Sequence, residues 1–412
     1  MIIHKPKIIE DETSVTISAK IEVENPLSGF PEFLFYKFPK GYKDFITDRV
    51  DGFAVSLLPL AMQLGEDLEI RGSLSSRLAK GMREYQLVQS TWKPAFFKLV
   101  DVKYDELIST LGESNQGSVG SSFSGGVDSF HTLLTHLPQN EPNQDYIISH
   151  CLIINGFEKD PDIESFAEFQ KKQQVYEPMM AANNLDFLVS CTNLRQFIGN
   201  ELLKQSFAAC ITASALILGR LFSRFYIPSS YKFTSMGTFP DGSHLMLDNL
   251  LSTESLQIIH DGAHFSRVEK TTDIAQWSET HSTLRVCFGG AEYQEQSNTI
   301  ENCCKCEKCI RTMITLDLCG ALQKYSTFPR PLKRQKIRNA YYNYKGSRLF
   351  AKEVLEYAKE IGRKDIVFDL RYALIRSIIW LKPLIFIFDL SARLKEHSET
   401  YCRFVRFVKR TA

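Results

Sequence analysis

Strand-like and helix-like segments alternate in the middle of the chain, and this alternation constrains the fold more than any other feature. Apolar runs stand at about 118–123, 146–156, 185–193 and 224–230, and helical stretches at about 127–137, 163–183 and 199–221. Alternation at this spacing predicts an α/β fold, with a parallel sheet covered by helices on both faces. Ligands of such sheets bind beyond the carboxyl ends of the strands. The loops of interest therefore begin at Ser124, Asn155, Thr192 and Ser229.

The loop after the first of these strands has the sequence SGGVDS at residues 124–129. Two adjacent glycines let the backbone turn tightly and approach an oxyanion without a Cβ in the way. The following helix N-terminus favours an anion, and Ser124 and Ser129 can donate hydrogen bonds. Asp128 would repel a bare phosphate unless it holds Mg²⁺ or caps the loop. Gly126 stands where a Walker motif has its lysine, so the loop predicts phosphate binding of another kind, with an ordinary Asp-capped turn as the alternative.

Ten cysteines are unevenly distributed, and four of them fall in the run CCKCEKC at residues 303–309. Three have the spacing CxxCxxC, which lets neighbouring thiolates meet one ion, and tetrahedral Zn²⁺ needs four ligands. Zinc is favoured, an iron–sulfur cluster is the main rival, and a redox pair is a weaker alternative. Cys304 and His281 compete for the fourth position. The expected ligands of this structural site are Cys287, Cys303, Cys306 and Cys309.

The loop sequence also resembles the SGGxDS signature of the PP-loop ATP pyrophosphatases, an adenine nucleotide alpha-hydrolase-like superfamily. The match to SGGVDS is complete and lies between an expected strand and an expected helix, as the family requires. The resemblance implies a parallel five-stranded-type HUP/PP-loop sheet with helices on both faces. It also implies that ATP and Mg²⁺ bind here and that ATP is cleaved between its α- and β-phosphates. The implied nucleotide contacts are Ser124, Gly125, Gly126, Val127, Asp128, Ser129 and Asn155.

Within this superfamily, the cysteine pattern resembles that of the 7-cyano-7-deazaguanine synthases, whose four-cysteine zinc site ends in a CxxCxxC run. The gap between Cys287 and Cys303 is longer here, and the strand at 118–123 is poorer in large apolar residues than is usual. The resemblance covers about 118–325, roughly half of the chain. It therefore bears on the ATP and zinc chemistry more than on the substrate.

The resemblance implies an ATP-dependent, C–N bond-forming ligase that adenylates a small-molecule substrate and releases pyrophosphate. A carboxylate or amide oxygen of the substrate would attack the α-phosphorus, and a nitrogen nucleophile would then displace AMP. Asp128, Ser129 and Lys270 would be the catalytic residues, with Asp128 helping to hold Mg²⁺. Two alternatives stay open: a PP-loop enzyme that thiolates or amidates tRNA, and a non-catalytic ATP sensor that binds a protein partner.

Polar side chains in the later loops are candidates for substrate binding. The segment 242–262 is the densest polar and aliphatic mixture in the chain. The segment 266–277 resembles the place where PP-loop enzymes put a basic residue before a helix, which makes Arg267 and Lys270 candidate partners of pyrophosphate. Helix caps and solvated charges are the alternatives. The expected substrate-binding residues are Asn193, Ser229, Ser243, His244, Asp248, Glu254 and Arg267.

Four regions are expected along the chain. Strands at 14–23 and 32–38 and a helix at 51–65 predict an α+β region before the alternating segment, and its role is unknown. The expected domains are 1–112 (N-terminal α+β region), 113–285 (ATP-binding domain), 286–325 (zinc-binding motif and following helix) and 326–412 (helical C-terminal extension).

Composition limits the partners. The formal net charge of +1 gives no strong nucleic-acid signal, although the flanking regions leave room for a protein partner. No secretion signal is evident at the N-terminus, so a cytoplasmic location is expected. The most hydrophobic stretch, 373–388, is short for a membrane span and carries Arg376, Lys382 and Pro383. It predicts a pair of buried helices and no membrane segment.

Overall fold

The structure is a computed structural model of the 412-residue chain. It describes residues 1–24, 29–158, 160–161, 163–236, 241–287, 292–294 and 299–394. The end of the predicted C-terminal extension, 395–412, lies outside the described residues. The chain forms two compact units, the first comprising 1–302 with 324–327 and the second 303–323 with the chain from 328 onward.

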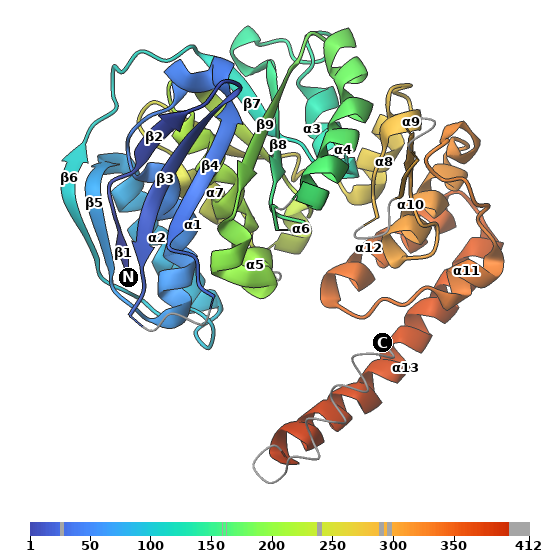
Figure 1. The fold of residues 1–412 in the computed structure, drawn as a ribbon. Helices are drawn as coiled ribbons and strands as arrows, with labels where there is room; N and C mark the ends of the chain where they lie inside the picture. The colour runs from blue at the N-terminus through green and yellow to red at the C-terminus, as the bar shows by residue number, and fades with distance from the viewer. Residues whose placement is uncertain are drawn as a thin grey trace. The chain divides into compact units, whose positions relative to one another are not determined.

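A mixed sheet of 11 strands forms the centre of the first unit (Figure 1). Five parallel neighbours make up one part of it, in the order β11 (Gln257–Asp261), β10 (Phe222–Pro228), β7 (Ser118–Ser122), β8 (His150–Asn155) and β9 (Asp186–Thr192). The parallel strands that the alternation predicts are therefore present. A sheet of five parallel strands alone is a wrong prediction, because N-terminal strands extend this sheet in mixed directions.

The N-terminal strands join the parallel part through one short antiparallel pairing. β4 (Phe33–Pro39) pairs with β9 at Tyr36↔Thr192 and Lys37↔Cys191. β3 (Ser14–Glu22), whose side chains alternate between buried and partly exposed, pairs antiparallel with β4. The remaining strands are β1 (Ile2–Ile3), β2 (Lys7–Glu10), β5 (Leu68–Ser75) and β6 (Val102–Ile108).

Helices cover both faces of the sheet. Leu188 of β9 packs into one continuous core with residues of α1 (Asp51–Leu64) and α5 (Leu194–Ile217). Its neighbour Phe187 contacts Tyr176 of α4 (Ile163–Ala182), and Tyr176 also contacts Phe130 of α3 (Val127–Thr135). Successive side chains of a strand point to opposite faces, so α3 and α4 lie on the face away from α1 and α5. The other long helix before β7 is α2 (Ser76–Trp92).

The segment after β10 contains one strand and several short helices, of which the sequence indicated only a helix within 266–277. β11 completes the parallel strands, and α8 (Arg267–Ile274) packs against α3. The other elements of this segment and its continuation are α6 (Phe233–Met236), α7 (Leu245–Asp248), α9 (Thr280–Thr283), β12 (Glu292–Gln294) and β13 (Thr299–Glu301).

The second unit is helical in its described part, as the sequence predicts. Its helices are α10 (Glu307–Leu318), α11 (Arg334–Asn339), α12 (Lys345–Glu360) and α13 (Lys364–Leu394). The buried Asp369 of α13 accepts hydrogen bonds from Arg334 Nε (2.7 Å) and Arg338 Nε (2.5 Å) of α11. The Arg311 guanidinium of α10 lies 4.4 Å from the ring centre of Phe350 on α12.

The prediction of two buried helices at 373–388 is wrong. This stretch belongs to the single helix α13, and Ile375 and Ile379 are 58% and 60% exposed. A search of the described residues finds no helix with both the length and the apolar character that crossing a membrane requires.

Candidate functional site

The glycine loop, residues 123–126, follows the central strand of the parallel part. From β7 the chain adds β8 and β9 on one side of β7, and then β10 and β11 on the other. The strand order therefore reverses between β7 and β10. Open parallel sheets bind ligands outside the carboxyl ends of their strands at such a reversal. The glycine loop and the residues after β10 lie at this position.

The backbone of the loop explains its two glycines. Gly125 has φ of 72°, and a Cβ placed on it would lie 1.7 Å from the hydroxyl oxygen of Tyr176. Only glycine is accommodated there, because the conformation is unfavourable for other residues and the space is filled. Gly126 caps the N-terminus of α3 with φ of −88°, and its nearest neighbour would be Ser124 Oγ at 3.3 Å from an added Cβ. Val127 is buried at the start of α3.

The two serines brace the loop from inside. Ser129 Oγ donates to the carbonyl oxygen of Gly126 (3.1 Å) and lies 3.3 Å from the backbone nitrogen of Ser124, from which it accepts. The Gly126 N–H donates to Ser124 Oγ at 3.3 Å. These bonds hold the loop against the first turn of α3, whose N–H groups have no partners within the helix.

Charged residues from α8 face the first turn of α3. Arg267 Nη2 lies 2.6 Å from Asp128 Oδ2, and Lys270 Nζ lies 3.8 Å from Asp128 Oδ1. Lys270 also donates to the carbonyl oxygen of Ser229 at 2.6 Å, just after β10, and its side chain is 1% exposed. Arg267 and Lys270 are three residues apart, so they share one face of α8. Asp128, Ser229, Arg267 and Lys270 are thus brought together at the glycine loop.

Two asparagines that were predicted to bind ligands have different surroundings. Asn155 ends β8 and is 6% exposed, and within the described chain its Nδ2 has no hydrogen-bond partner. Asn193 uses both ends of its amide: Oδ1 accepts from Phe35 N (3.0 Å) and Nδ2 donates to Phe33 O (2.9 Å). Asn193 therefore holds the backbone of β4, whereas the Asn155 amide has a donor that no described residue uses.

Three predicted substrate residues lie together, but they bond to one another. Asp248 is fully buried, and its Oδ2 accepts from Ser243 Oγ (2.6 Å) and from His260 Nδ1 (2.7 Å). Its Oδ1 accepts from the N–H of His244 at 3.0 Å. His244 Nδ1 accepts from Met246 N and so caps α7. These contacts give the cluster a structural role in closing the segment around α7.

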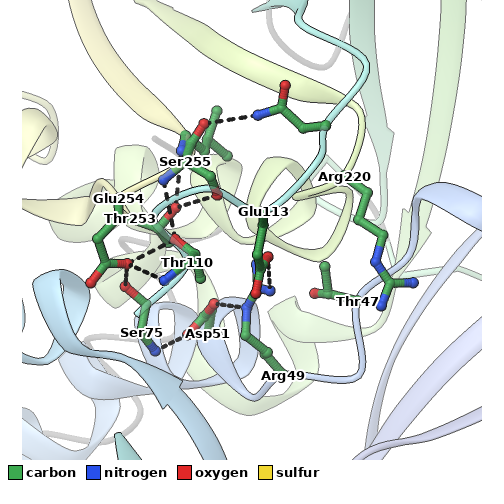
Figure 2. Close-up of polar contacts among 12 residues, drawn as sticks. Thr47, Arg49, Asp51, Ser75, Thr110, Glu113, Arg220, Thr253, Glu254 and Ser255 are labelled. Atoms are coloured by element: carbon green, nitrogen blue, oxygen red, sulfur yellow. Dashed lines mark hydrogen bonds and ion pairs between the residues drawn. The ribbon is translucent and has the colours of Figure 1, made fainter. Parts of the chain in front are cut away.

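Glu254 belongs to a second cluster, the Glu254 network, which joins the N-terminal region to the segment before β11 (Figure 2). Its Oε2 accepts from Ser75 Oγ (2.8 Å) and Thr110 Oγ1 (2.8 Å), and its Oε1 accepts from Arg77 N (2.9 Å). Burial raises the pKa of Glu254, but the hydrogen bonds from Thr110 and the Arg77 N–H outweigh burial and lower it to about 2. The network comprises Arg49, Asp51, Ser75, Arg77, Thr110, Glu113 and Glu254.

The four predicted metal ligands converge. Their sulfur atoms all lie within 4.8 Å of one another, close to the edge of about 3.8 Å that a tetrahedron with Zn–S bonds of about 2.3 Å requires. This cluster could hold a metal such as zinc. A cluster of several irons would spread its four thiolates further apart, because they are divided between different irons. The residues are Cys287, Cys303, Cys306 and Cys309.

The backbone prepares these sulfurs for a cation. The N–H groups of Lys305 and Cys306 point at Cys303 Sγ (3.4 and 3.3 Å), and the N–H of Cys309 points at Cys306 Sγ (3.5 Å). These contacts fix the positions of Cys303 Sγ and Cys306 Sγ within the cysteine run. Asn302 Oδ1 accepts from the Cys287 N–H at 3.1 Å and so fixes the backbone at the most distant cysteine in the sequence.

Cys304 and His281, the competitors for the fourth position, lie outside the cysteine cluster. Cys304 is buried with φ of 52°, and burial raises the pKa of its thiol. His281 Nε2 lies 3.1 Å from the carbonyl oxygen of Ala275.

Sequence patterns gave no indication of three charged residues beside the glycine loop: Glu158 after β8, Lys172 on α4 and Arg285 before Cys287. Arg285 Nη1 and Nη2 lie 2.6 and 2.8 Å from the two carboxylate oxygens of Glu158, and Lys172 Nζ lies 3.3 Å from Oε1. Lys172 precedes Tyr176 by four residues, so both share one face of α4. That spacing is the one sequence feature that could place Lys172 near the glycine loop. It does so only once Tyr176 is known to contact the loop.

Comparison with protein-family models, curated proteins and solved structures finds no match for this chain.

Proposed function

We propose that this chain binds ATP at the glycine loop and uses it to adenylate a substrate, with release of pyrophosphate. The observation that carries the proposal is the conformation of Gly125, where no Cβ fits, directly before the N-terminus of α3 at the reversal of strand order. The N–H groups of a first helical turn favour an anion. A nucleoside triphosphate offers that anion where such sheets bind their ligands.

In this proposal a carboxylate or amide oxygen of a small-molecule substrate attacks the α-phosphorus of ATP. The bond from the α-phosphorus to the bridging oxygen breaks, and pyrophosphate leaves with the bonding electron pair. A nitrogen nucleophile then displaces AMP, and a C–N bond forms. Lys270 and Arg267 lie beside the loop, where their charge would stabilise the negative charge that develops on the leaving group.

Asp128 is the proposed Mg²⁺ ligand. Its carboxylate and the Ser230 hydroxyl, 3.5 Å apart, are oxygen ligands of the type that Mg²⁺ prefers. Arg267 and Lys270 are paired with the same carboxylate, so Mg²⁺ would compete with both side chains for Asp128. Binding of ATP would remove this competition, because its phosphates would attract Arg267 and Lys270. When bound, Mg²⁺ neutralises charge on the pyrophosphate group.

The cysteine cluster is proposed to hold one structural Zn²⁺. Four thiolates complete a tetrahedral site and leave no position open for a substrate. Elemental analysis of the purified chain should find about one zinc per molecule, and Cys306→Ser should reduce it. Iron with labile sulfide in place of zinc would instead favour the tRNA-modifying alternative.

Calorimetric titration with ATP and Mg²⁺ tests the nucleotide site. We expect Gly125→Val to weaken ATP binding at least about 100-fold, because a side chain there must displace Tyr176 and adopt an unfavourable φ. Gly41→Val is the control, since Gly41 lies outside the loop and nothing lies within 4 Å of a Cβ added there. Unchanged ATP affinity in a folded Gly125→Val chain would contradict the proposal.

Pyrophosphate release in the presence of ATP, ammonia and a series of small carboxylic acids tests the reaction. We expect release only with the acid that the site accepts, and we expect AMP in equal amount. ATP that binds but is never cleaved with any acid would support the sensor alternative and exclude the enzyme.

A further inference from the structure

The Glu158 carboxylate lies between two basic side chains from separate parts of the first unit. Arg285 makes a bidentate pair with it at 2.6 and 2.8 Å, and Lys172 lies 3.3 Å from one of the same oxygens. The side chain of Arg195 also contacts the backbone oxygen of Glu158. Two buried cations thus share one carboxylate, and we call Glu158, Lys172 and Arg285 the Glu158 cluster.

Two contacts fix the Glu158 cluster against the glycine loop. The backbone N–H of Arg285 donates to the carbonyl oxygen of Gly125 at 2.7 Å. Tyr176, one helical turn after Lys172 on α4, places its hydroxyl against the Cα of Gly125. Lys172 and Arg285 are therefore held beside the loop by contacts that do not involve Glu158.

The burial of these groups is unequal. The side chains of Lys172 and Arg285 are 7% and 9% exposed, whereas that of Glu158 is 44% exposed. Within the Glu158 cluster, two positively charged side chains contact the same carboxylate. A buried cation is costly unless an anion pairs with it. The anion that now pairs with both cations faces the solvent and can be replaced from there.

We propose that Lys172 and Arg285 form a binding site for the pyrophosphate part of the nucleotide, and that Glu158 fills this site as an exchangeable counter-ion. The proposal rests on the ATP-dependent function and assigns residues to its leaving group. On binding, phosphate oxygens replace the carboxylate oxygens on Arg285, and Glu158 turns to the solvent.

The chemistry of the groups supports this exchange. A guanidinium forms the same pair of parallel hydrogen bonds with a phosphate as with a carboxylate. Pyrophosphate carries more charge than one carboxylate, so it interacts more strongly with two cations at the same distances. In the proposed reaction, the electron pair of the broken bond remains on pyrophosphate, and Lys172 and Arg285 stabilise that charge.

The pKa values of Lys172 and Glu158 fit two groups whose charges are opposed by burial and supported by each other. Burial lowers the pKa of Lys172 to about 8, although the charge of Glu158 opposes this shift. Burial raises the pKa of Glu158, but Lys172 and Arg285 outweigh burial and lower it to about 2. Glu158 is therefore charged at neutral pH and available as the counter-ion.

Calorimetric titration of the full chain with inorganic pyrophosphate tests the proposal. We expect Lys172→Met and Arg285→Met each to weaken binding about 10- to 100-fold, the loss typical of a charged hydrogen bond. We expect Glu158→Gln to bind pyrophosphate several-fold more tightly, because the competing charge is gone. Lys204→Met, a change at a side chain that is 72% exposed on α5, is the control and should bind as the unmodified chain does.

Two results would overturn the proposal. Unchanged pyrophosphate affinity in Lys172→Met and Arg285→Met would exclude both residues, even if Gly125→Val had lost ATP binding. Weaker binding in Glu158→Gln would show that Glu158 supports the site structurally and does not compete with the ligand. If the chain binds pyrophosphate through Lys172 and Arg285 but never binds ATP, the pyrophosphate site is supported and the ATP-dependent function is contradicted. If Arg285→Met fails to fold, Lys172→Met and Glu158→Gln still decide the question.

Discussion

The glycine loop and the Glu254 network contain the same types of polar and charged residues, but these residues have different partners in the two places. In the Glu254 network, both oxygens of Asp51 and of Glu254 accept hydrogen bonds from within the first unit. At the glycine loop, Asn155 Nδ2 is buried without a partner in the described chain, and Arg267 and Lys270 of α8 both lie within 3.8 Å of the Asp128 carboxylate. The carboxylates of the first cluster are satisfied by groups of the first unit, whereas the second cluster contains a buried donor that no described residue uses.

The comparison shows that residue type and burial do not separate a ligand site from a structural contact. Glu254 and Asp128 are both acidic, and the sequence predicts both of them as residues of a ligand site. Their difference is in the partners: backbone N–H and hydroxyl groups surround Glu254, whereas two basic side chains face Asp128. Substitutions in the two clusters should therefore affect different measurements.

The largest effect is expected in the Glu254 network. Asp51→Ala should lower the free energy of unfolding by about 3 kcal/mol, because the buried Arg49 loses its partner at 2.8 Å and keeps the more exposed Glu113. Urea denaturation measures the loss, and the exposed Asp48→Ala is the control. ATP affinity of the folded fraction should not change; a parallel loss of ATP affinity would mean that the two clusters are not separate.

The next effect is expected at the glycine loop and in turnover. Asp128→Asn should slow pyrophosphate release about 100-fold, since the carboxylate that would hold Mg²⁺ is lost. Its effect on the free energy of unfolding should stay within about 1 kcal/mol, because the pair with Arg267 is partly exposed. Asp145→Asn, at an exposed position, is the control. A loss of stability without a loss of turnover would make Asp128 a structural residue.

The two asparagines give a matched pair. Asn193→Ala should destabilise the fold by about 1–3 kcal/mol, because it leaves Phe33 O and Phe35 N without their partner. Asn155→Ala should change stability less than that, because its Nδ2 has no partner in the described chain to lose. It should weaken ATP binding about tenfold, because the proposed hydrogen bond from Nδ2 to the nucleotide is lost. Denaturation and ATP titration are needed for both variants. A loss of ATP affinity in Asn193→Ala together with a loss of stability in Asn155→Ala would contradict our interpretation.

The smallest effect is expected for Glu254→Gln and depends on pH. The pKa of Glu254 in the folded chain, about 2, is below the unfolded value of about 4.3, so its contribution is present above about pH 4.5 and is lost as the pH falls toward 2. Glu254→Gln should cost about 1 kcal/mol at neutral pH and make the acid decline of stability shallower. The exposed Glu84→Gln should leave this decline unchanged; an equal change in both variants would refute the assignment.

Local patterns were enough to predict several parts of the molecule. The strand at 14–23, the helix at 51–65 and the alternation from 118 onward all appear in the structure within a few residues. The glycine loop and the cysteine run are equally local, because each brings its residues together within one turn. The N–H groups that point at the cysteine sulfurs follow from the same short spacing.

Contacts between distant residues could not be read in this way. Asn193 bonds to residues 158 and 160 positions away, and Glu254 bonds to Ser75, 179 positions away. Nothing in the sequence around either residue shows where its partner will be, so both were expected to bind a substrate. The pairing of β4 with β9 has the same origin, and it made the expected five-stranded sheet part of a larger one.

That pairing has a consequence for how the chain can be divided. β9 would otherwise end the parallel strands with a row of unsatisfied backbone groups, and such an open border recruits strands from other molecules. A shortened chain beginning at residue 113 would lack β4 and would expose that border beside Thr192. Through β4, the first 112 residues thus cover part of the border that β9 would otherwise leave open.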